Sequence, residues 1–525
     1  MDKLTAQISF ISLKKILLAI LSGLLLTASF PAPNFSYLAW ISIIPLLYSI
    51  RDVEGKKAFL LGLISGLSHY LTLMYWIINT IKTYGELPFI LGLLLLLLLA
   101  LYLSLYIALF CCLITKFCLT SKNIQVYTPI IWILLEYLRG KLLTGFPWLL
   151  LGYSQFERLN LIQVSDIFGV YGISFLIIFV NVSLFIVFLH LTKIKWKFLQ
   201  INKKDSTLSI IICFFLFLSS LLYGKWQIYN FDKKTFPLLK AAVIQGNIDQ
   251  SAKWDYVVQE QNLNKYISLS KSAKISKPDI IVWPETAASF YYKNNAYLSA
   301  LLDANIRAIN TNFIIGSPSF ERKQNETILY FNSAYLINNY ATVEGRYDKV
   351  HLVPFGEYVP LKKILPFIEK IVENIGDFSN GKKGEILYLN NAKIGVQICY
   401  EVIFPELSSA IVRNGANVIV NITNDAWFGF SSAPFQHFSM VVFRAIENKK
   451  SVIRSANTGI SGFIDPLGRI ISFSPLFVES MLVENVPLVE NQTFYSKHGD
   501  VFIFLCLCFF IFILYQNGYL KLRKE

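Results

Sequence analysis

The chain has few charged residues for its length. Only 16% of its 525 residues are charged, whereas 54% are hydrophobic and 15% are aromatic. Soluble domains carry about 25% charged residues, so this composition excludes an ordinary soluble domain and is typical of a membrane protein. The formal net charge of +14 does not indicate nucleic-acid binding, because the basic residues lie scattered between apolar runs and form no patch interleaved with aromatic side chains.

Cysteine and histidine are also scarce. The seven cysteines form no CxxC pair and no disulfide framework, and the five histidines are too dispersed for metal-ligand spacing, so we expect no metal site. Six of the cysteines lie inside long apolar runs, where Cys behaves as a small hydrophobe. Cys399 differs, because the strand-like stretch 395–398 precedes it and Tyr400 and Glu401 follow. By itself this pattern fits either a nucleophile at the end of a buried strand or a buried core thiol.

Long apolar stretches fill the first half of the chain. Each is near the ~20 residues that a helix needs to cross a bilayer. They lie at 15–30, 36–50, 58–80, 88–115, 124–138, 168–191 and 207–224, with an eighth at 501–515. A cleaved signal peptide is an alternative for the first, but Thr27-Ala-Ser-Phe is a poor cleavage site. The sequence therefore predicts a bundle of eight transmembrane helices, seven within residues 1–224 and one within 498–525.

Lysine and arginine gather in alternate loops. The basic segments precede the first stretch, separate the second from the third, the fourth from the fifth and the sixth from the seventh, and end the chain. By the positive-inside rule both termini are cytoplasmic. Seven spans then place residues 225–497 on the outer side of the membrane. We thus expect a multi-pass membrane protein with a domain on the outer side of the membrane.

The segment from Glu136 to Ser154 is an outer loop that contains glycines, a proline and aromatic residues. It fits either a re-entrant floor or gate for a lipid head group, or an interfacial belt of aromatic residues with turns. Sequence alone leaves both open.

Residues 225–497 have the composition of a soluble α/β domain. Strand-like segments lie at 241–246, 279–283, 313–316, 332–338, 341–347, 394–399, 417–422, 451–455 and 461–464. Helical patterns lie at about 255–274, 296–310, 403–413 and 435–449. Strands that alternate with helices predict α/β architecture.

Three polar side chains stand at strand ends or in the loops that follow. They are Glu285 after Trp283-Pro, Lys349 after Tyr347-Asp, and Cys399. A glutamate can act as general base, a lysine can stabilise an oxyanion and lower a thiol pKa, and a thiolate can attack a carbonyl. Taken singly, Glu285 also fits a loop charge and Lys349 a solvated face.

Longer motifs around these residues give a resemblance. They are Val282-Trp-Pro-Glu-Thr, Tyr347-Asp-Lys-Val-His-Leu-Val-Pro-Phe-Gly-Glu-Tyr-Val-Pro, Ile398-Cys-Tyr-Glu-Val-Ile-Phe-Pro-Glu, Asn424-Asp-Ala-Trp-Phe-Gly, Arg454-Ser-Ala-Asn-Thr-Gly and Thr144-Gly-Phe-Pro-Trp. Together they resemble the nitrilase (carbon–nitrogen hydrolase) superfamily, and most closely its membrane branch, the apolipoprotein N-acyltransferases. The resemblance covers essentially the whole chain, and Val402-Ile403 is its one small departure. It implies a nitrilase-like αββα sandwich within residues 225–497.

The resemblance also implies roles for the site residues. Glu285 would be the general base, Lys349 the oxyanion donor and Cys399 the nucleophile. The supporting residues implied are Glu357, which would hold the lysine and the substrate, Tyr400, whose backbone N–H would be the second oxyanion donor, Glu401, and the lipid-site aromatic residues Trp254 and Trp427. Glu357 also fits a plain loop carboxylate, and each tryptophan also fits core packing.

The implied reaction is a two-step acyl transfer without a metal or an organic cofactor. A phospholipid, with phosphatidylethanolamine as the family's preferred donor, would acylate Cys399, and the resulting thioester would pass its acyl chain to the N-terminal diacylglyceryl-cysteine of an apolipoprotein. We expect a monomer that binds no nucleic acid.

Two other classes of function remain open. An anchored amidase or nitrilase would use the same acyl-cysteine, but one helix would suffice to anchor it. A transporter with a sensor domain is disfavoured, because the acids in or near the spans, Glu136 and Asp166, lie at the expected outer boundary.

Overall fold

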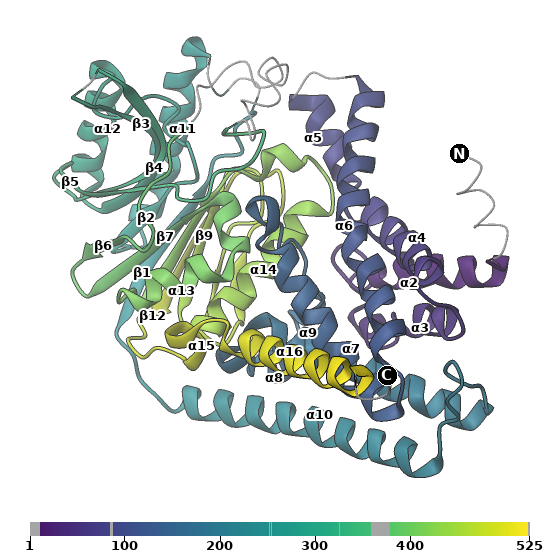
Figure 1. The fold of residues 1–525 in the computed structure, drawn as a ribbon. Helices are drawn as coiled ribbons and strands as arrows, with labels where there is room; N and C mark the ends of the chain where they lie inside the picture. The colour runs from purple at the N-terminus through teal and green to yellow at the C-terminus, as the bar shows by residue number, and fades with distance from the viewer. Residues whose placement is uncertain are drawn as a thin grey trace. The chain divides into compact units, whose positions relative to one another are not determined.

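The computed structural model describes residues 11–84, 88–250, 253, 255–324, 326–358 and 378–522. The chain divides into two compact units (Figure 1). The helical unit comprises Met1–Asn79, Leu87–Tyr229 and Asp500–Glu525. The α/β unit comprises Thr80–Glu86 and Asn230–Gly499.

The eight predicted apolar stretches are all mainly helical where the structure describes them. In chain order they correspond to α2 (Leu13–Ala28), η1 with α3 (Ser36–Trp40, Ile44–Ile50), α4 with α5 (Lys56–Leu73, Trp76–Tyr84), α6 (Phe89–Phe117), α7 (Ser121–Arg139), α9 (Ser165–Thr192), α10 (Lys203–Asp232) and α16 (Val501–Leu522). Three described helices, α6, α9 and α10, are long and apolar enough to cross a membrane, and the bent pair α4–α5 would count as a fourth if it forms a single span. The other stretches do not meet that test in the described residues, so a bundle of eight spans remains a prediction.

Helices α4 and α6 pack closely because small residues face each other. A Cβ added to Gly62 would lie 2.7 Å from the Cα of Ala108, and one added to Gly66 would lie 2.7 Å from the Cα of Ser104. Gly62 and Gly66 are four residues apart, as are Ser104 and Ala108, so each pair lies on one helix face. This small-xxx-small pairing lets the backbones approach, as in membrane helix pairs generally.

The segment that follows α7 folds back into the helical unit. It contains η2 (Leu142–Thr144), η3 (Leu151–Gln155) and α8 (Leu159–Ile162). Glu136 Oε1 accepts a hydrogen bond from the backbone N–H of Leu151 at 2.7 Å, and Arg139 Nη2 donates to the carbonyl of Trp148 at 3.4 Å. Trp148 is 2% exposed and Tyr153 is fully buried. These two rings therefore pack inside the unit and do not form an aromatic belt that faces lipid.

The α/β unit contains two six-stranded sheets. The first has the order β12-β1-β2-β3-β4-β5 and the second the order β11-β10-β9-β8-β7-β6. Strands β1, β2 and β3 are parallel, as are β7, β8 and β9, and the outer pairs are antiparallel. In chain order the strands are β1 (Leu238–Gln245), β2 (Ile280–Val282), β3 (Asn312–Arg322), β4 (Ile328–Ile337), β5 (Val343–Asp348), β6 (Ile386–Leu389), β7 (Ala392–Ile398), β8 (Val418–Thr423), β9 (Ser451–Ala456), β10 (Gly462–Ile464), β11 (Ile470–Phe473) and β12 (Ser480–Pro487).

The sheets pack face to face and helices cover their outer sides. Apolar residues of both sheets, such as Val282 and Val420, form one buried core. Helices α11 (Tyr256–Lys274) and α12 (Ala296–Ile309) pack on the first sheet through a second apolar core. Helices α13 (Pro405–Arg413) and α14 (Ala433–Asn448) contact the second sheet. Helix α15 (Phe494–His498) packs against these two helices. The predicted αββα sandwich is the observed architecture of this unit (Figure 1).

The hydroxyl of Ser455 joins the two sheets at the edge that carries the site. Ser455 Oγ in β9 lies 3.1 Å from the carbonyl oxygens of Ile244 in β1 and Val282 in β2. The bridge lies at the carboxyl ends of these parallel strands, which is the edge where open α/β sheets carry their functional loops.

Candidate active site

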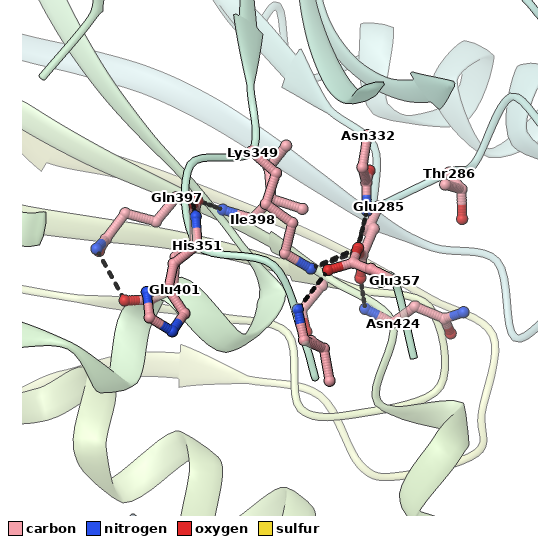
Figure 2. Close-up of polar contacts among 12 residues, drawn as sticks. Glu285, Thr286, Asn332, Lys349, His351, Glu357, Gln397, Ile398, Glu401 and Asn424 are labelled. Atoms are coloured by element: carbon pink, nitrogen blue, oxygen red, sulfur yellow. Dashed lines mark hydrogen bonds and ion pairs between the residues drawn. The ribbon is translucent and has the colours of Figure 1, made fainter. Parts of the chain in front are cut away.

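Glu285 lies in the loop after β2, where it is 6% exposed. Its Oε1 accepts hydrogen bonds from Asn332 Nδ2 at 2.8 Å and from Lys349 Nζ at 3.4 Å (Figure 2). Its Oε2 accepts a hydrogen bond from the backbone N–H of Asn424 at 2.9 Å. Both carboxylate oxygens are therefore held, and the carboxylate has a fixed position in the site.

Lys349 follows β5 and is 1% exposed. Its ammonium lies 2.9 Å from Glu357 Oε1, while Glu357 Oε2 accepts the backbone N–H of Val353 at 2.8 Å. Asn332 Nδ2 also donates to Glu357 Oε1, at 2.8 Å, so one amide and one ammonium bridge two carboxylates. Burial alone would lower the pKa of Lys349, but the carboxylates of Glu357 and Glu285 outweigh it and raise the pKa above its usual value. Lys349 therefore stays positively charged.

The sequence suggested that Cys399 ends a strand. In the structure it instead occupies a sharp turn just after the strand. Strand β7 ends at Ile398, and Cys399 begins the 3₁₀-helix η5 (Cys399–Ile403). Its φ of +53° lies in the left-handed region, which is sparsely populated by residues other than glycine. Such outliers concentrate at functional sites, where the surrounding structure enforces them.

The thiol of Cys399 is less acidic than we expected. We expected the charge of Lys349 to lower its pKa, and Lys349 does act in that direction. Burial acts more strongly, because only 8% of the residue is exposed, and together with the charge of Glu285 it raises the pKa to about 12. The resting group is therefore a thiol, and it needs a base in order to react.

Glu401 links the loops that carry Lys349 and Cys399. Its fully buried Oε2 accepts the backbone N–H of Ile398 at 2.7 Å. Its Oε1 accepts the backbone N–H groups of Val350 at 2.5 Å and His351 at 3.1 Å (Figure 2). Burial raises the pKa of Glu401 to about 7.

Of the remaining predicted residues, Tyr400 and Trp427 lie in the described part of the chain. The Tyr400 ring contacts Phe404, with ring centroids 5.2 Å apart. Trp427 lies in η6 (Asp425–Phe428) and is 38% exposed, which is more than a core tryptophan would be. Trp254 lies outside the described residues.

A buried ion network next to Cys399 was not assigned a role from the sequence. Arg454 Nη2 lies 2.7 Å from Asp425 Oδ2, and His437 Nδ1 lies 3.1 Å from Asp425 Oδ1. Burial alone would raise the pKa of Asp425, but the charge of Arg454, together with the hydrogen bond of His437, outweighs it and lowers that pKa. Thr423 Oγ1 also donates to Asp425 at 2.9 Å. The sequence signal was present, because Asp425 and Arg454 stand in two of the motifs that carried the resemblance.

The remaining polar groups of the site became visible only in three dimensions. Asn332 lies within strand β4, the backbone N–H of Asn424 carries no side-chain pattern, and Lys253 stands in a loop after β1. Their contacts with Glu285 join segments that are 47, 139 and 32 residues apart in the chain. A list of residue types cannot reveal such contacts.

The arrangement combines a fixed carboxylate, a permanent cation and a buried thiol on adjacent loops. These are the groups that acyl transfer through a cysteine requires, namely a base, an electrostatic donor and a nucleophile. Within the part of the chain that the structure describes, no group of three His, Cys, Asp or Glu residues is placed to hold a metal ion.

Comparison with known proteins agrees with this division of the chain. Residues 22–183 match the family model of the apolipoprotein N-acyltransferase N-terminal domain, and residues 240–494 match that of carbon-nitrogen hydrolase. The apolipoprotein N-acyltransferase of Geobacter metallireducens is 44% identical over 94% of this chain and 93% of its own length. The chain belongs to the apolipoprotein N-acyltransferase family. The member from Rickettsia prowazekii is 32% identical over 95% of this chain and 97% of its own length.

Solved structures cover about half of this chain at lower similarity. An amidase from Nesterenkonia sp. is 17% identical, covers 51% of this chain and 96% of its own, and has a TM-score of 0.38. The nitrilase-superfamily protein Nit3 of Saccharomyces cerevisiae is 19% identical, covers 48% of this chain and 90% of its own, and has a TM-score of 0.37. Family membership and the apolar helices together indicate a membrane protein.

Proposed function

We propose that this member of the family transfers a fatty acyl chain from a membrane phospholipid to the α-amino group of the N-terminal diacylglyceryl-cysteine of apolipoproteins. Cys399 carries the acyl chain between the two substrates as a thioester. The observation that carries the proposal is the convergence of Glu285, Lys349 and the Cys399 turn in a chain whose relatives are named for this activity.

In the first step the sulfur of Cys399 attacks the carbonyl carbon of a phospholipid acyl ester. Because its pKa is about 12, the thiol gives its proton to Glu285 as the carbon–sulfur bond forms. The Lys349 ammonium and the backbone N–H of Tyr400 stabilise the negative charge on the carbonyl oxygen. The carbon–oxygen ester bond then breaks, Glu285 returns the proton to the departing oxygen, and a lysophospholipid leaves.

In the second step the α-amino nitrogen of the apolipoprotein attacks the thioester carbonyl. Glu285 takes a proton from that nitrogen, the same donors stabilise the oxyanion, and the carbon–sulfur bond breaks. The proton passes to the sulfur, which restores the thiol and releases the N-acylated protein. A buried site favours this outcome, because water excluded from the thioester cannot hydrolyse it.

The fixed positions of the three groups support these roles. Three hydrogen-bond donors hold the Glu285 carboxylate, and Glu357 holds the Lys349 ammonium at 2.9 Å. Near-attack geometry depends on such restraint, because misplacement of a reacting group by about 1 Å can cost roughly a hundredfold in rate.

Both substrates are anchored in a bilayer, so the proposal places the enzyme in the bacterial cytoplasmic membrane with the α/β unit on the periplasmic side. Phosphatidylethanolamine is the proposed acyl donor and a diacylglyceryl apolipoprotein the acceptor. Trp427, which is 38% exposed, is proposed to contact lipid near the site.

The test is intact-mass analysis of the purified protein in detergent that contains phospholipid, with Cys399→Ser as the matched control. We expect a hydroxylamine-labile fatty-acyl adduct on the wild type alone, which a diacylated lipopeptide with a free amine discharges as the triacylated product. An adduct that only water discharges would indicate a hydrolase. An unmodified wild type that behaves like Cys399→Ser under every condition would refute the proposal.

A further inference from the structure

Lys253 is a buried lysine in contact with the loop of Glu285. It follows β1 in the chain and is 2% exposed. Its Nζ donates hydrogen bonds to the backbone carbonyl of Glu285 at 3.0 Å and to Thr286 Oγ1 at 2.6 Å. A buried ammonium is costly unless it is paired and hydrogen-bonded, so its place next to the proposed base needs a physical reason.

The turn that Lys253 holds is strained. Thr286 has a φ of +48°, a left-handed conformation that a β-branched residue rarely adopts. From the other side β3 presses on the same turn, because a Cβ added to Gly316 would lie 2.4 Å from the carbonyl oxygen of Pro284 and 2.5 Å from the nitrogen of Thr286. The ammonium of Lys253 and the backbone of Gly316 thus fix the peptide that carries the Glu285 side chain.

Lys253 also changes the charge of the site. Glu285 and Glu357 together carry two negative charges, and Lys349, which contacts both, carries one positive charge. These three groups alone have a net charge of −1, which opposes negative charge on the Cys399 sulfur. Lys253 brings the sum to zero.

Lys253 remains mostly charged near neutral pH. Burial lowers its pKa to about 8, while the charge of Glu285 and negative charge on Cys399 act to raise it. Negative charge on the sulfur therefore raises the pKa of Lys253, and the positive charge of Lys253 in turn stabilises the thiolate.

We propose that Lys253 is a positioning residue of the reaction, which fixes the turn of the general base and supplies a second positive charge that favours ionisation of Cys399. The inference rests on the proposed function for its place in the reaction. Its structural alternative is a lysine that only holds the turn, without an effect on the thiol.

The test measures alkylation of Cys399 by iodoacetamide, followed by site-resolved peptide mass analysis so that the other cysteines do not interfere. Lys253→Gln keeps a hydrogen-bond donor and removes the charge, whereas Lys253→Arg keeps the charge. Lys450→Gln is the matched control, because Lys450 is also fully buried and donates to the backbone carbonyls of Val489 and Asn491.

We expect Lys253→Gln to alkylate roughly tenfold more slowly than wild type at a fixed pH near 7, where Lys253 is mostly charged, which corresponds to a rise of about one unit in the thiol pKa. Lys253→Arg and Lys450→Gln should alkylate within about twofold of wild type. In the acyl-adduct assay Lys253→Gln should lower kcat for adduct formation and leave KM for phospholipid within about twofold, because the residue acts on the reacting groups and not on lipid binding.

Equal alkylation rates in wild type and Lys253→Gln would overturn the proposal, as would a loss shared equally by Lys450→Gln. If Lys253→Gln unfolds, Lys253→Arg decides, since a tenfold loss in this folded variant would show that charge is not the property that matters. Alkylation needs no acyl transfer, so its outcome is separate from that of the proposed function. A wild type that alkylates as expected but never forms a lipid adduct would refute only the proposed function.

Discussion

Replacement of Lys349 with methionine tests whether one ammonium holds two buried carboxylates together. Its Nζ lies 3.4 Å from Glu285 Oε1 and 2.9 Å from Glu357 Oε1, and the three side chains are 1%, 8% and 12% exposed. Removal of one partner from a buried ion pair costs about 3–5 kcal/mol, because the other charge stays buried without compensation. With roughly 2–4 °C of melting temperature per kcal/mol, the variant should melt about 6–20 °C below wild type.

A second substitution separates charge repulsion from lost packing. In Lys349→Met the carboxylates of Glu285 and Glu357 remain on the same Asn332 amide, 2.8 Å from its Nδ2 in each case. Glu357→Gln removes one of these two negative charges. The double variant should therefore be about 1–3 kcal/mol more stable than the sum of the two single effects predicts. Acyl-adduct formation should stay absent, since the proposed oxyanion donor is still missing.

The assay is thermal unfolding in detergent, followed by tryptophan fluorescence, for the two single variants and the double variant. Lys393→Met is the control, because its ion pair with Glu490 is exposed and should contribute only about 0–1 kcal/mol. Strict additivity of Lys349→Met and Glu357→Gln would refute the reasoning. So would a Lys349→Met variant that melts with wild type or still forms the acyl adduct.

Three further predictions follow from individual contacts. Because the pKa of Cys399 is about 12, its alkylation rate should keep rising to about pH 11, and a plateau near pH 9, the value of an ordinary thiol, would contradict the buried site. Gly66→Leu should destabilise the α4–α6 contact by about 1–3 kcal/mol or more, while Gly92→Ala, whose Cβ would meet its nearest neighbour at 3.6 Å, should be tolerated; equal melting temperatures would exclude the close approach. Burial raises the pKa of Glu401 from 4.5 to about 7, so its contribution to stability is full below about pH 4.5 and is lost as the pH rises through about 7. The melting temperature of wild type should thus fall over this range more steeply than that of Glu401→Gln, and parallel pH profiles would show that Glu401 does not titrate there.

The sequence predicted the features that depend on local pattern. Buried parallel strands such as β8 are largely apolar, with Asn421 as the one interior polar residue of β8, and the residues after β2 and β5 stood out as polar groups at strand ends. The edge strands β6, β11 and β12 were missed. Strands β6 and β11 have only four residues each, the shortest length over which a strand pattern can be read, and most of β12 is half-buried. The turn between β6 and β7 does have a sequence signal. It is Asn390-Asn391, because asparagine tolerates the left-handed conformation, and Asn390 has a φ of +50°.

The residues of the site were easier to predict from the sequence than their pKa values and contacts. Glu285, Lys349 and Cys399 followed from their motifs, but the direction of the Cys399 pKa shift did not. That direction depends on the balance between burial of the thiol, which raises its pKa, and the charge of Lys349, which lowers it. Both are set by the tertiary structure. The contacts of Asn332, Asn424 and Lys253 with Glu285 likewise arise only when distant segments meet.

The hydroxyl of Ser455 has a consequence for when the enzyme can become active. Glu285 and Lys349 belong to the first sheet and Cys399 to the second, and Ser455 ties the sheets together at 3.1 Å from Ile244 and Val282. Neither sheet carries both the proposed base and the proposed nucleophile. A newly made chain whose sheets have not yet docked would thus lack the proposed catalytic set, which forms only when the two sheets meet.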